Sequence, residues 1–319
     1  MTTNEIPNVA PVQSAPADPS DVAAIARARG VLVSLEITTW SARRLDKRVT
    51  KEATRREGAD DDAGRFNKHL LGGKVESHSA VIAAAGAARV AHYRETLPWA
   101  DEGARLLPIG NYFEYAKIVR DERAKFAAAV ETFLQEYPNL QADAARRLGA
   151  MYDPSDYPHV SDVAKRFTFR VHFSPVPAAS DIRVDLPPEV TAHIERSVTA
   201  RVENAVHGAV TEGWNRLAES VARIRDRLTE IAGMPEDGPA GRLHASIFAG
   251  AVETAETLKR LNVLGDPALD AMADRIVSEL SGLDPKAIRK DPAAMSETAK
   301  RADDILSAMA GFYGEGGAS

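Results

Sequence analysis

The sequence contains no cysteine among its 319 residues. This absence excludes disulfides, cysteine-ligated zinc sites, iron–sulfur clusters and thiol nucleophiles, and it is typical of proteins that fold in a reducing compartment. The Walker A motif, the G-x-G-x-x-G fingerprint, the H-E-x-x-H zinc motif and the G-x-S-x-G elbow are absent as well. Together these absences argue against an enzyme, and an active site assembled from residues scattered along the sequence is kept as the third alternative.

Long apolar runs are also missing. The longest one, residues 80–88, includes Gly86 and ends at Arg89, whereas a helix that spans a bilayer needs about 20 apolar residues. The first 20 residues have neither the basic start nor the apolar stretch of a secretory signal. We therefore expect a cytoplasmic protein with no membrane partner.

The residues that bind metals are present but not at ligand spacing. An EF-hand loop that begins at Asp60 would need a glutamate at its twelfth position, where Leu71 stands. His193 and His207 are fourteen residues apart, which separates them by about 21 Å along a helix. The sequence predicts no metal and no cofactor.

Three segments alternate apolar and polar residues, as half-buried strands do. They are residues 31–38, 167–173 and 182–186. Three strands packed against helices are about the smallest stable sheet. A helix over 42–57 is expected after the first strand, with Ser41 as its N-cap.

Helical patterns cover most of the remaining chain. We expect helices over 74–96, 111–136 and 139–151, the last two separated at Pro138 because the residue before proline disfavours helix. Residues 189–232 contain no proline, and their apolar residues recur at steps of four and three, the rhythm of a coiled coil.

Further helices follow this long one. A return helix is expected over 242–261, and three Asp-Pro pairs, at 266, 284 and 291, each predict a helix start because aspartate caps the free amides and proline fits the first turn. The predicted class is α+β, predominantly α-helical, with a small antiparallel sheet of about three strands. The predicted organisation is a disordered tail over 1–20, an α+β region over 21–187, a long-helix hairpin with C-terminal helices over 188–313, and a flexible tail over 314–319.

The charge is unevenly distributed. The formal net charge is −6, yet residues 41–74 hold ten basic and six acidic residues, a net charge of +4, whereas residues 262–319 hold ten acidic and six basic residues, a net charge of −4. Seven of the basic residues fall within the predicted helix 42–57: Arg43, Arg44, Lys47, Arg48, Lys51, Arg55 and Arg56.

Two interpretations of these seven residues stay open. They form a surface that contacts nucleic acid or an acidic partner, or they are the solvated face of a helix in a protein with 29 arginines and 11 lysines. Trp40 stands beside them and either stacks on a base or belongs to the core.

The order of several segments carries a family resemblance. These are the strand over 31–38 followed by Trp40-Ser41-Ala42-Arg43-Arg44-Leu45, the segment 114–137, the strand over 166–173, the long helix, and Leu261-Asn262-Val263-Leu264-Gly265-Asp266-Pro267. Over about residues 28–312 the chain resembles a family of uncharacterised phage, prophage and bacterial proteins whose genes lie near those of MoxR-type AAA+ ATPases and von Willebrand A-domain proteins. The resemblance supplies no catalytic residues.

We therefore expect a non-enzymatic interaction protein. The resemblance implies an adaptor or assembly partner of an AAA+ ATPase, located in the host cytoplasm if the gene belongs to a phage, and the long helix suits self-association. The alternative is a protein of phage replication or recombination that binds or anneals single-stranded nucleic acid.

Overall fold

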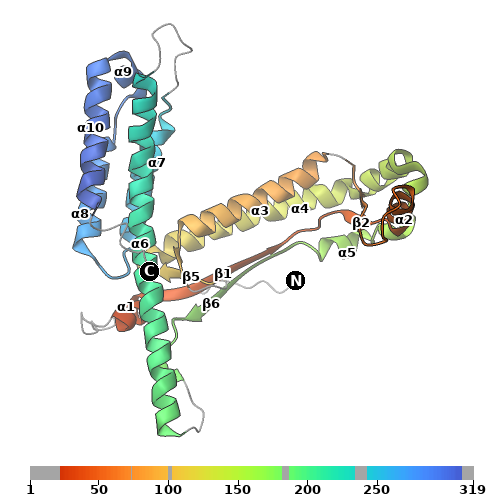
Figure 1. Ribbon diagram of the computed structural model, residues 1–319, viewed down its shortest axis with the longest axis horizontal. Helices are drawn as coiled ribbons and strands as arrows, with labels where there is room; N and C mark the ends of the chain where they lie inside the picture. The colour runs from red at the N-terminus through yellow and green to blue at the C-terminus, as the bar shows by residue number, and fades with distance from the viewer. Residues whose placement is uncertain (1–21, 73, 100–102, 182–186, 234–242, 311–319) are drawn as a thin grey trace. The chain divides into compact units, whose positions relative to one another are not determined.

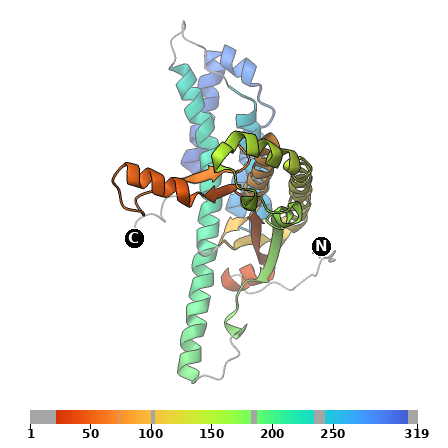
Figure 2. The ribbon, with the colours of Figure 1, turned by 90° about the vertical axis from the view of Figure 1, so that its right-hand side faces the viewer.

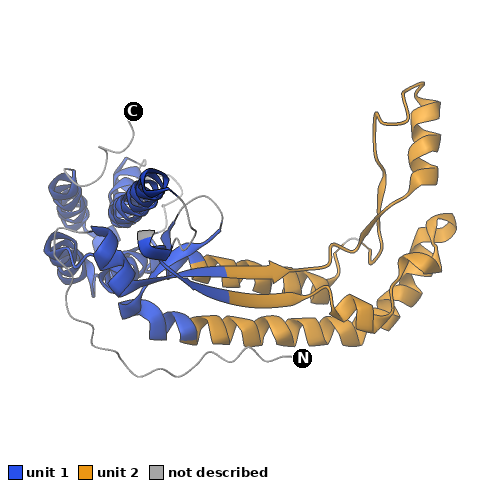
Figure 3. Ribbon diagram, turned by 90° about the horizontal axis from the view of Figure 1, so that it is seen from below, with its two compact units in different colours: residues 1–34, 93–116, 172–319 blue, residues 35–92, 117–171 orange. Residues whose placement is uncertain are grey.

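A computed structural model describes residues 22–72, 74–99, 103–181, 187–233 and 243–310. The predicted tails and the predicted strand over 182–186 lie outside these ranges. The chain packs as two compact units, shown in Figure 3: the described residues of 1–34, 93–116 and 172–319 form unit 1, and those of 35–92 and 117–171 form unit 2. This division differs from the predicted one, which placed a boundary near residue 187. Unit 1 also includes the described residues of 1–34 and 93–116, and elements of both segments pack on its long helix.

The long helix of unit 1 is α6, Pro188–Ala232, which confirms the prediction of a helix over 189–232. It packs on α7 (Ser246–Leu261), on α10 (Pro292–Met309) and on the short helix α1 (Val22–Arg29) (Figures 1 and 2). Its buried residues begin at Val202, and the four-residue apolar spacing from there onward faces this core.

The Asp-Pro pairs begin helices as predicted. Helix α8 spans Pro267–Leu280, α9 spans Pro285–Lys290, and α10 follows directly. In each, the aspartate side chain accepts a hydrogen bond from a first-turn amide: Asp266 from Ala268 N, Asp284 from Lys286 N, and Asp291 from Ala293 N. These caps satisfy amides that have no partner within the helix.

The main sheet has four strands in the order β4-β5-β1-β6. Strands β1 (Gly30–Thr38) and β6 (Thr168–Pro175) confirm two predicted strands. The small antiparallel sheet predicted with about three strands is thus confirmed, with β4 (Leu97–Pro98) and β5 (Arg105–Pro108) as two strands that the sequence did not predict; β5 pairs antiparallel with β1 from Gly30↔Pro108 to Val33↔Arg105. Two and four residues are too few to show an alternating pattern, which hid β4 and β5 in the sequence.

A second, two-stranded sheet in unit 2 corrects the predicted helix over 42–57. Strand β2 (Arg43–Leu45) pairs with β3 (Asn67–His69), and helix α2 begins only at Lys47 and ends at Arg56. Its N-cap is therefore Asp46, which accepts a hydrogen bond from Val49 N at 3.0 Å, and not Ser41. The pairing with β3 holds 43–45 extended, and it joins segments that the sequence separates by about twenty residues.

The two remaining long helices are α3 (Glu76–Arg94) and α4 (Tyr112–Leu148), and α5 (Val160–Ala164) is short. Helix α4 continues through Pro138, so the predicted break there was wrong. A proline inside a helix costs about 3 kcal/mol. Burial of the adjacent Tyr137, which is 2% exposed and donates a hydrogen bond to the carbonyl of Pro158 at 3.0 Å, offsets that cost.

Aromatic residues form the centre of the unit 2 core. Trp40 is 5% exposed, and its ring lies 5.7 Å from that of Tyr137 and 6.4 Å from that of Phe133. Trp40 is therefore a core residue and is not placed to stack on a base. Within the described residues, no helix combines the length and the apolar character needed to cross a membrane.

Candidate functional site

All seven predicted contact residues are exposed and lie on one continuous segment of unit 2. Arg43 and Arg44 belong to β2, and the other five, Lys47, Arg48, Lys51, Arg55 and Arg56, belong to α2. The structure thus keeps these cations together, although two of them lie on a strand and not on the predicted helix.

Three of the seven form ion pairs. Arg44 Nε lies 3.3 Å from Asp156 Oδ1, Arg48 Nη1 lies 3.5 Å from Glu52 Oε2, and Arg56 Nε lies 3.1 Å from Glu57 Oε1. The last two pairs are exposed, and such pairs contribute about 0–1 kcal/mol and exchange readily with another anion, whereas the side chain of Asp156 is 9% exposed. Within the described part of the chain, the other four cations have no carboxylate partner: Arg43, Lys47, Lys51 and Arg55.

Three of the four unpaired cations share one side of α2. Lys47, Lys51 and Arg55 are spaced four residues apart, which places them in a row about 12 Å long. Like charges at this spacing repel one another and weaken the helix by a few tenths of a kcal/mol per pair. A bound polyanion removes this repulsion.

A groove of about 880 Å³ lies at the N-terminal end of this row, where Lys47 lines it. Its cationic wall is formed by residues 43–48 and contributes Arg43, Arg44, Lys47 and Arg48. Residues 150–156 also line the groove, and they include Tyr152, Asp153 and Pro154. Tyr152 escaped the sequence analysis because it lies far along the chain from the basic segment and belongs to no periodic pattern.

A buried ion-pair network connects residues 43–48 with residues 150–156. Lys68, on β3, is 7% exposed, and its Nζ lies 2.5 Å from Asp156 Oδ2 and 2.8 Å from the carbonyl oxygen of Met151. The same Nζ lies 3.9 Å from Asp46 Oδ2, the carboxylate that caps α2. Lys68 is therefore neutralised inside the protein, and it joins α2, β3 and the turn at 150–156 instead of facing a ligand.

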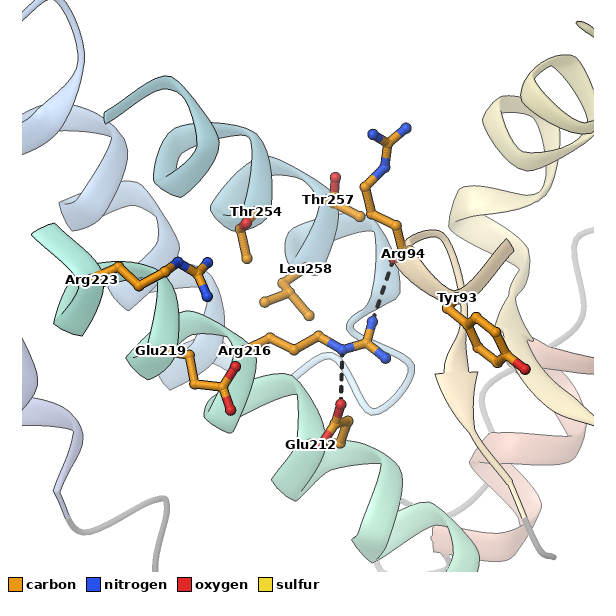
Figure 4. Close-up of a pocket in the computed structure, with 9 residues that line it drawn as sticks. All are labelled: Tyr93, Arg94, Glu212, Arg216, Glu219, Arg223, Thr254, Thr257 and Leu258. Atoms are coloured by element: carbon orange, nitrogen blue, oxygen red, sulfur yellow. Dashed lines mark hydrogen bonds and ion pairs between the residues drawn. The ribbon is translucent and has the colours of Figure 1, made fainter. Parts of the chain in front are cut away.

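A second cavity, of about 370 Å³, lies in unit 1 between the end of α3, the middle of α6 and α7 (Figure 4). Arg216 crosses it: its Nε donates to Glu212 Oε1 at 3.1 Å, and its Nη1 donates to the Thr96 carbonyl oxygen at 3.0 Å. Nearby, Arg105 is half-buried, and its partial burial, together with the charge of Arg216, lowers the pKa of Arg105 to about 10. Arg216 is thus paired within the protein, which indicates a structural role for this side chain.

A buried carboxylate follows Arg94 in the chain. Glu95 is 1% exposed, and it accepts hydrogen bonds from Arg94 Nε at 2.8 Å and from Asn111 Nδ2 at 3.2 Å. Arg260 Nη2 lies 3.6 Å from Glu95 Oε2, and Arg260 Nε donates to Asn111 Oδ1 at 2.8 Å. This network joins the end of α3, the start of α4 and α7 within unit 1.

Within the described ranges, no group of three or more histidine, aspartate or glutamate side chains is placed to hold a metal ion. Comparison with known proteins adds no relative: neither a protein-family model, nor a curated protein, nor a solved structure matches this chain.

Proposed function

We propose that the protein is a non-enzymatic binding protein that binds nucleic acid through the β2–α2 surface of unit 2. The observation that carries the proposal is the set of four exposed cations that have no carboxylate partner among the described residues, Arg43, Lys47, Lys51 and Arg55; the first two of them line a groove together with Arg44 and Arg48. Phosphate groups spaced along a strand are the ligand that such a row of cations binds.

The charge of unit 2 supports this proposal. Its two segments, 35–92 and 117–171, hold 20 basic and 16 acidic residues, a net charge of +4, whereas the rest of the chain holds 20 basic and 30 acidic residues, a net charge of −10. The overall acidity therefore does not oppose nucleic-acid binding, since the acidic residues are concentrated outside unit 2.

Salt dependence tests the proposal quantitatively. Each phosphate neutralised on a single strand contributes about −0.7 to the slope of log K against log salt, so the four unpaired cations predict a slope of about −3 and all seven predict about −5. We would measure the binding of fluorescent oligonucleotides to the full chain by anisotropy between 20 and about 300 mM salt. No binding at the lowest salt concentration would refute the proposal.

A matched pair of charge-reversal variants separates the surface from net charge. The first replaces Arg43, Lys47, Lys51 and Arg55 with glutamate. The control replaces four exposed cations of the C-terminal helices, Lys286, Arg289, Lys290 and Lys300, which changes the net charge by the same amount. We expect the first variant to lose about 10²–10³-fold in affinity at 0.1 M salt and the control to lose much less. Equal losses would show that the β2–α2 surface is not the site.

We propose the adaptor role as a second candidate, on the strength of the first turns of α6. No residue of this helix before Val202 is buried, although Val190, Ile194 and Val198 continue its apolar spacing, and Val190 is 43% exposed. This stretch suits self-association, or contact with an AAA+ ATPase such as the MoxR type that the resemblance implies. A chain that stays monomeric at high concentration in light scattering, and that does not bind a purified ATPase of this type, would contradict the role.

A further inference from the structure

We infer that the groove of unit 2 binds a single strand of nucleic acid, with its phosphates on the cationic wall and one base stacked on Tyr152. This inference rests on the proposed function and adds to it the form of the nucleic acid and the residue that selects it. The juxtaposition that carries it is that Tyr152 lines the same groove of about 880 Å³ as Arg43, Lys47 and Arg48.

Tyr152 is held as a fixed platform. Its ring centroid lies 5.3 Å from that of Tyr157, which is 7% exposed and donates a hydrogen bond to the carbonyl oxygen of Leu70 at 2.8 Å. The preceding carbonyl, that of Met151, accepts a hydrogen bond from Lys68 Nζ. Tyr152 itself is half-buried and lines the groove. These contacts hold the Tyr152 ring in place before a base binds.

The charged residues that line the groove determine where the phosphates and the bases of a bound strand lie. Asp153 lines the same wall as Tyr152, and its carboxylate accepts a hydrogen bond from the amide of Ser155 at 2.9 Å, which holds the pKa of Asp153 below its usual value. An ionised Asp153 repels phosphate, whereas Arg43 and Lys47, which line the same groove, attract it. The phosphates therefore follow the β2–α2 wall, and the bases point toward Tyr152.

Stacking on Tyr152 distinguishes a single strand from a duplex. In a duplex both faces of each base are covered by neighbouring bases, so the Tyr152 ring has no free base to contact. Stacking on an aromatic side chain contributes the same type of interaction for every base, so we expect little sequence preference. DNA and RNA strands both satisfy this chemistry.

The test compares three versions of the full chain, the wild type, Tyr152→Leu and Tyr152→Phe, with 20-nucleotide oligo-dT, oligo-U and a 20-base-pair duplex. We expect the wild type to prefer single strands. Tyr152→Leu should weaken single-strand binding by about 5–150-fold and leave duplex affinity and the salt slope unchanged. Tyr152→Phe should behave as the wild type does, because the Tyr152 hydroxyl is not needed for stacking. The relative affinities for oligo-dT and oligo-U then show whether single-stranded DNA or single-stranded RNA is bound more tightly.

A second exposed aromatic residue gives the control. Phe113, in unit 1, is 61% exposed, and Phe113→Leu should leave all affinities unchanged. A 2-aminopurine base in the oligonucleotide adds a readout that does not depend on a destabilising variant, since its fluorescence should be quenched on binding to the wild type and to Tyr152→Phe.

Each other outcome refutes a defined part of the reasoning. Equal affinity of the wild type for single strands and duplex, no effect of Tyr152→Leu, or unquenched 2-aminopurine would overturn the inference and leave the proposed function standing. Failure of the wild type to bind either form at low salt would refute the proposed function itself.

Discussion

Replacing Glu95 with glutamine removes one negative charge from the interior of unit 1 without changing the size of the side chain. The carboxylate of Glu95 faces three donors: Arg94 Nε at 2.8 Å, Asn111 Nδ2 at 3.2 Å and Arg260 Nη2 at 3.6 Å. A glutamine at this position accepts hydrogen bonds only through its carbonyl oxygen. Its side-chain NH2 group then faces one of these three donors.

The expected loss of stability follows from these contacts. A buried hydrogen bond to a charged group contributes about 1.5–3 kcal/mol, and a buried donor without an acceptor costs about 1–3 kcal/mol. The side chains of Arg94 and Arg260 are 47% and 36% exposed, so water replaces part of what they lose. We therefore expect Glu95→Gln to lower the free energy of unfolding by about 3 kcal/mol, a large share of the 5–15 kcal/mol of a typical domain.

Urea unfolding combined with hydrogen exchange of α6 and α7 peptides measures this loss within unit 1. Glu219→Gln is the control, because Glu219 is an exposed residue of α6 without a hydrogen-bond or ion-pair partner within the described part of the chain. That variant should change stability by less than about 0.5 kcal/mol. A loss below about 1 kcal/mol for Glu95→Gln, or equal losses in the two variants, would show that the Glu95 network does not hold these elements together.

Three further predictions concern single side chains. Lys68→Met leaves the carboxylates of Asp46 and Asp156 without their buried cation, so we expect a loss of about 3–5 kcal/mol, measured as faster hydrogen exchange in α2 and β3. Asp291→Ala removes the cap of α10, whose Oδ1 accepts from the amides of Ala293 and Ala294, and should cost about 1 kcal/mol in urea unfolding. Burial raises the pKa of Tyr157 from 10.0 to about 12, so the folded protein keeps a proton that the unfolded chain releases. The stability that wild type has over Tyr157→Phe should therefore be constant below pH 10 and disappear as the pH rises toward 12.

Each of these has a matched comparison. Lys74→Met removes an exposed cation of unit 2 and should leave exchange in α2 unchanged, and Asp304→Ala, on the exposed side of α10, should leave stability within about 0.5 kcal/mol of wild type. An effect at either control as large as at its partner contradicts the reasoning. For Tyr157, the difference between the two proteins cancels the other groups that titrate in alkali, including Arg105, and a difference that stays constant to pH 12 would refute the assigned burial effect.

Local signals in the sequence were sufficient for most helices and for two strands. The Asp-Pro pairs carry their own capping groups, so α8, α9 and α10 begin where the sequence predicts. The four-residue spacing over 189–232 contains enough turns for its period to be unmistakable, and the alternation in β1 and β6 runs over nine and eight residues, enough to show a period of two. These features depend on residues within a few positions of one another.

The tertiary structure decided what depends on distant partners. Strands β2, β4 and β5 have four residues or fewer and are extended because another strand pairs with them, and α4 continues through Pro138 because the burial of Tyr137 outweighs the cost of the proline.

The same distinction applies to the candidate site. The sequence by itself identified the seven cations of this surface, because they lie within fourteen residues of the chain, but it also counted Lys68 among the basic residues and offered Trp40 as a stacking residue. Only the fold buries Lys68 against Asp156, places Trp40 in the core and brings Tyr152 to the groove beside Arg43. The sequence of a segment determines its charge density. Burial and the full set of residues that line a groove depend on residues that come together only after the chain has folded.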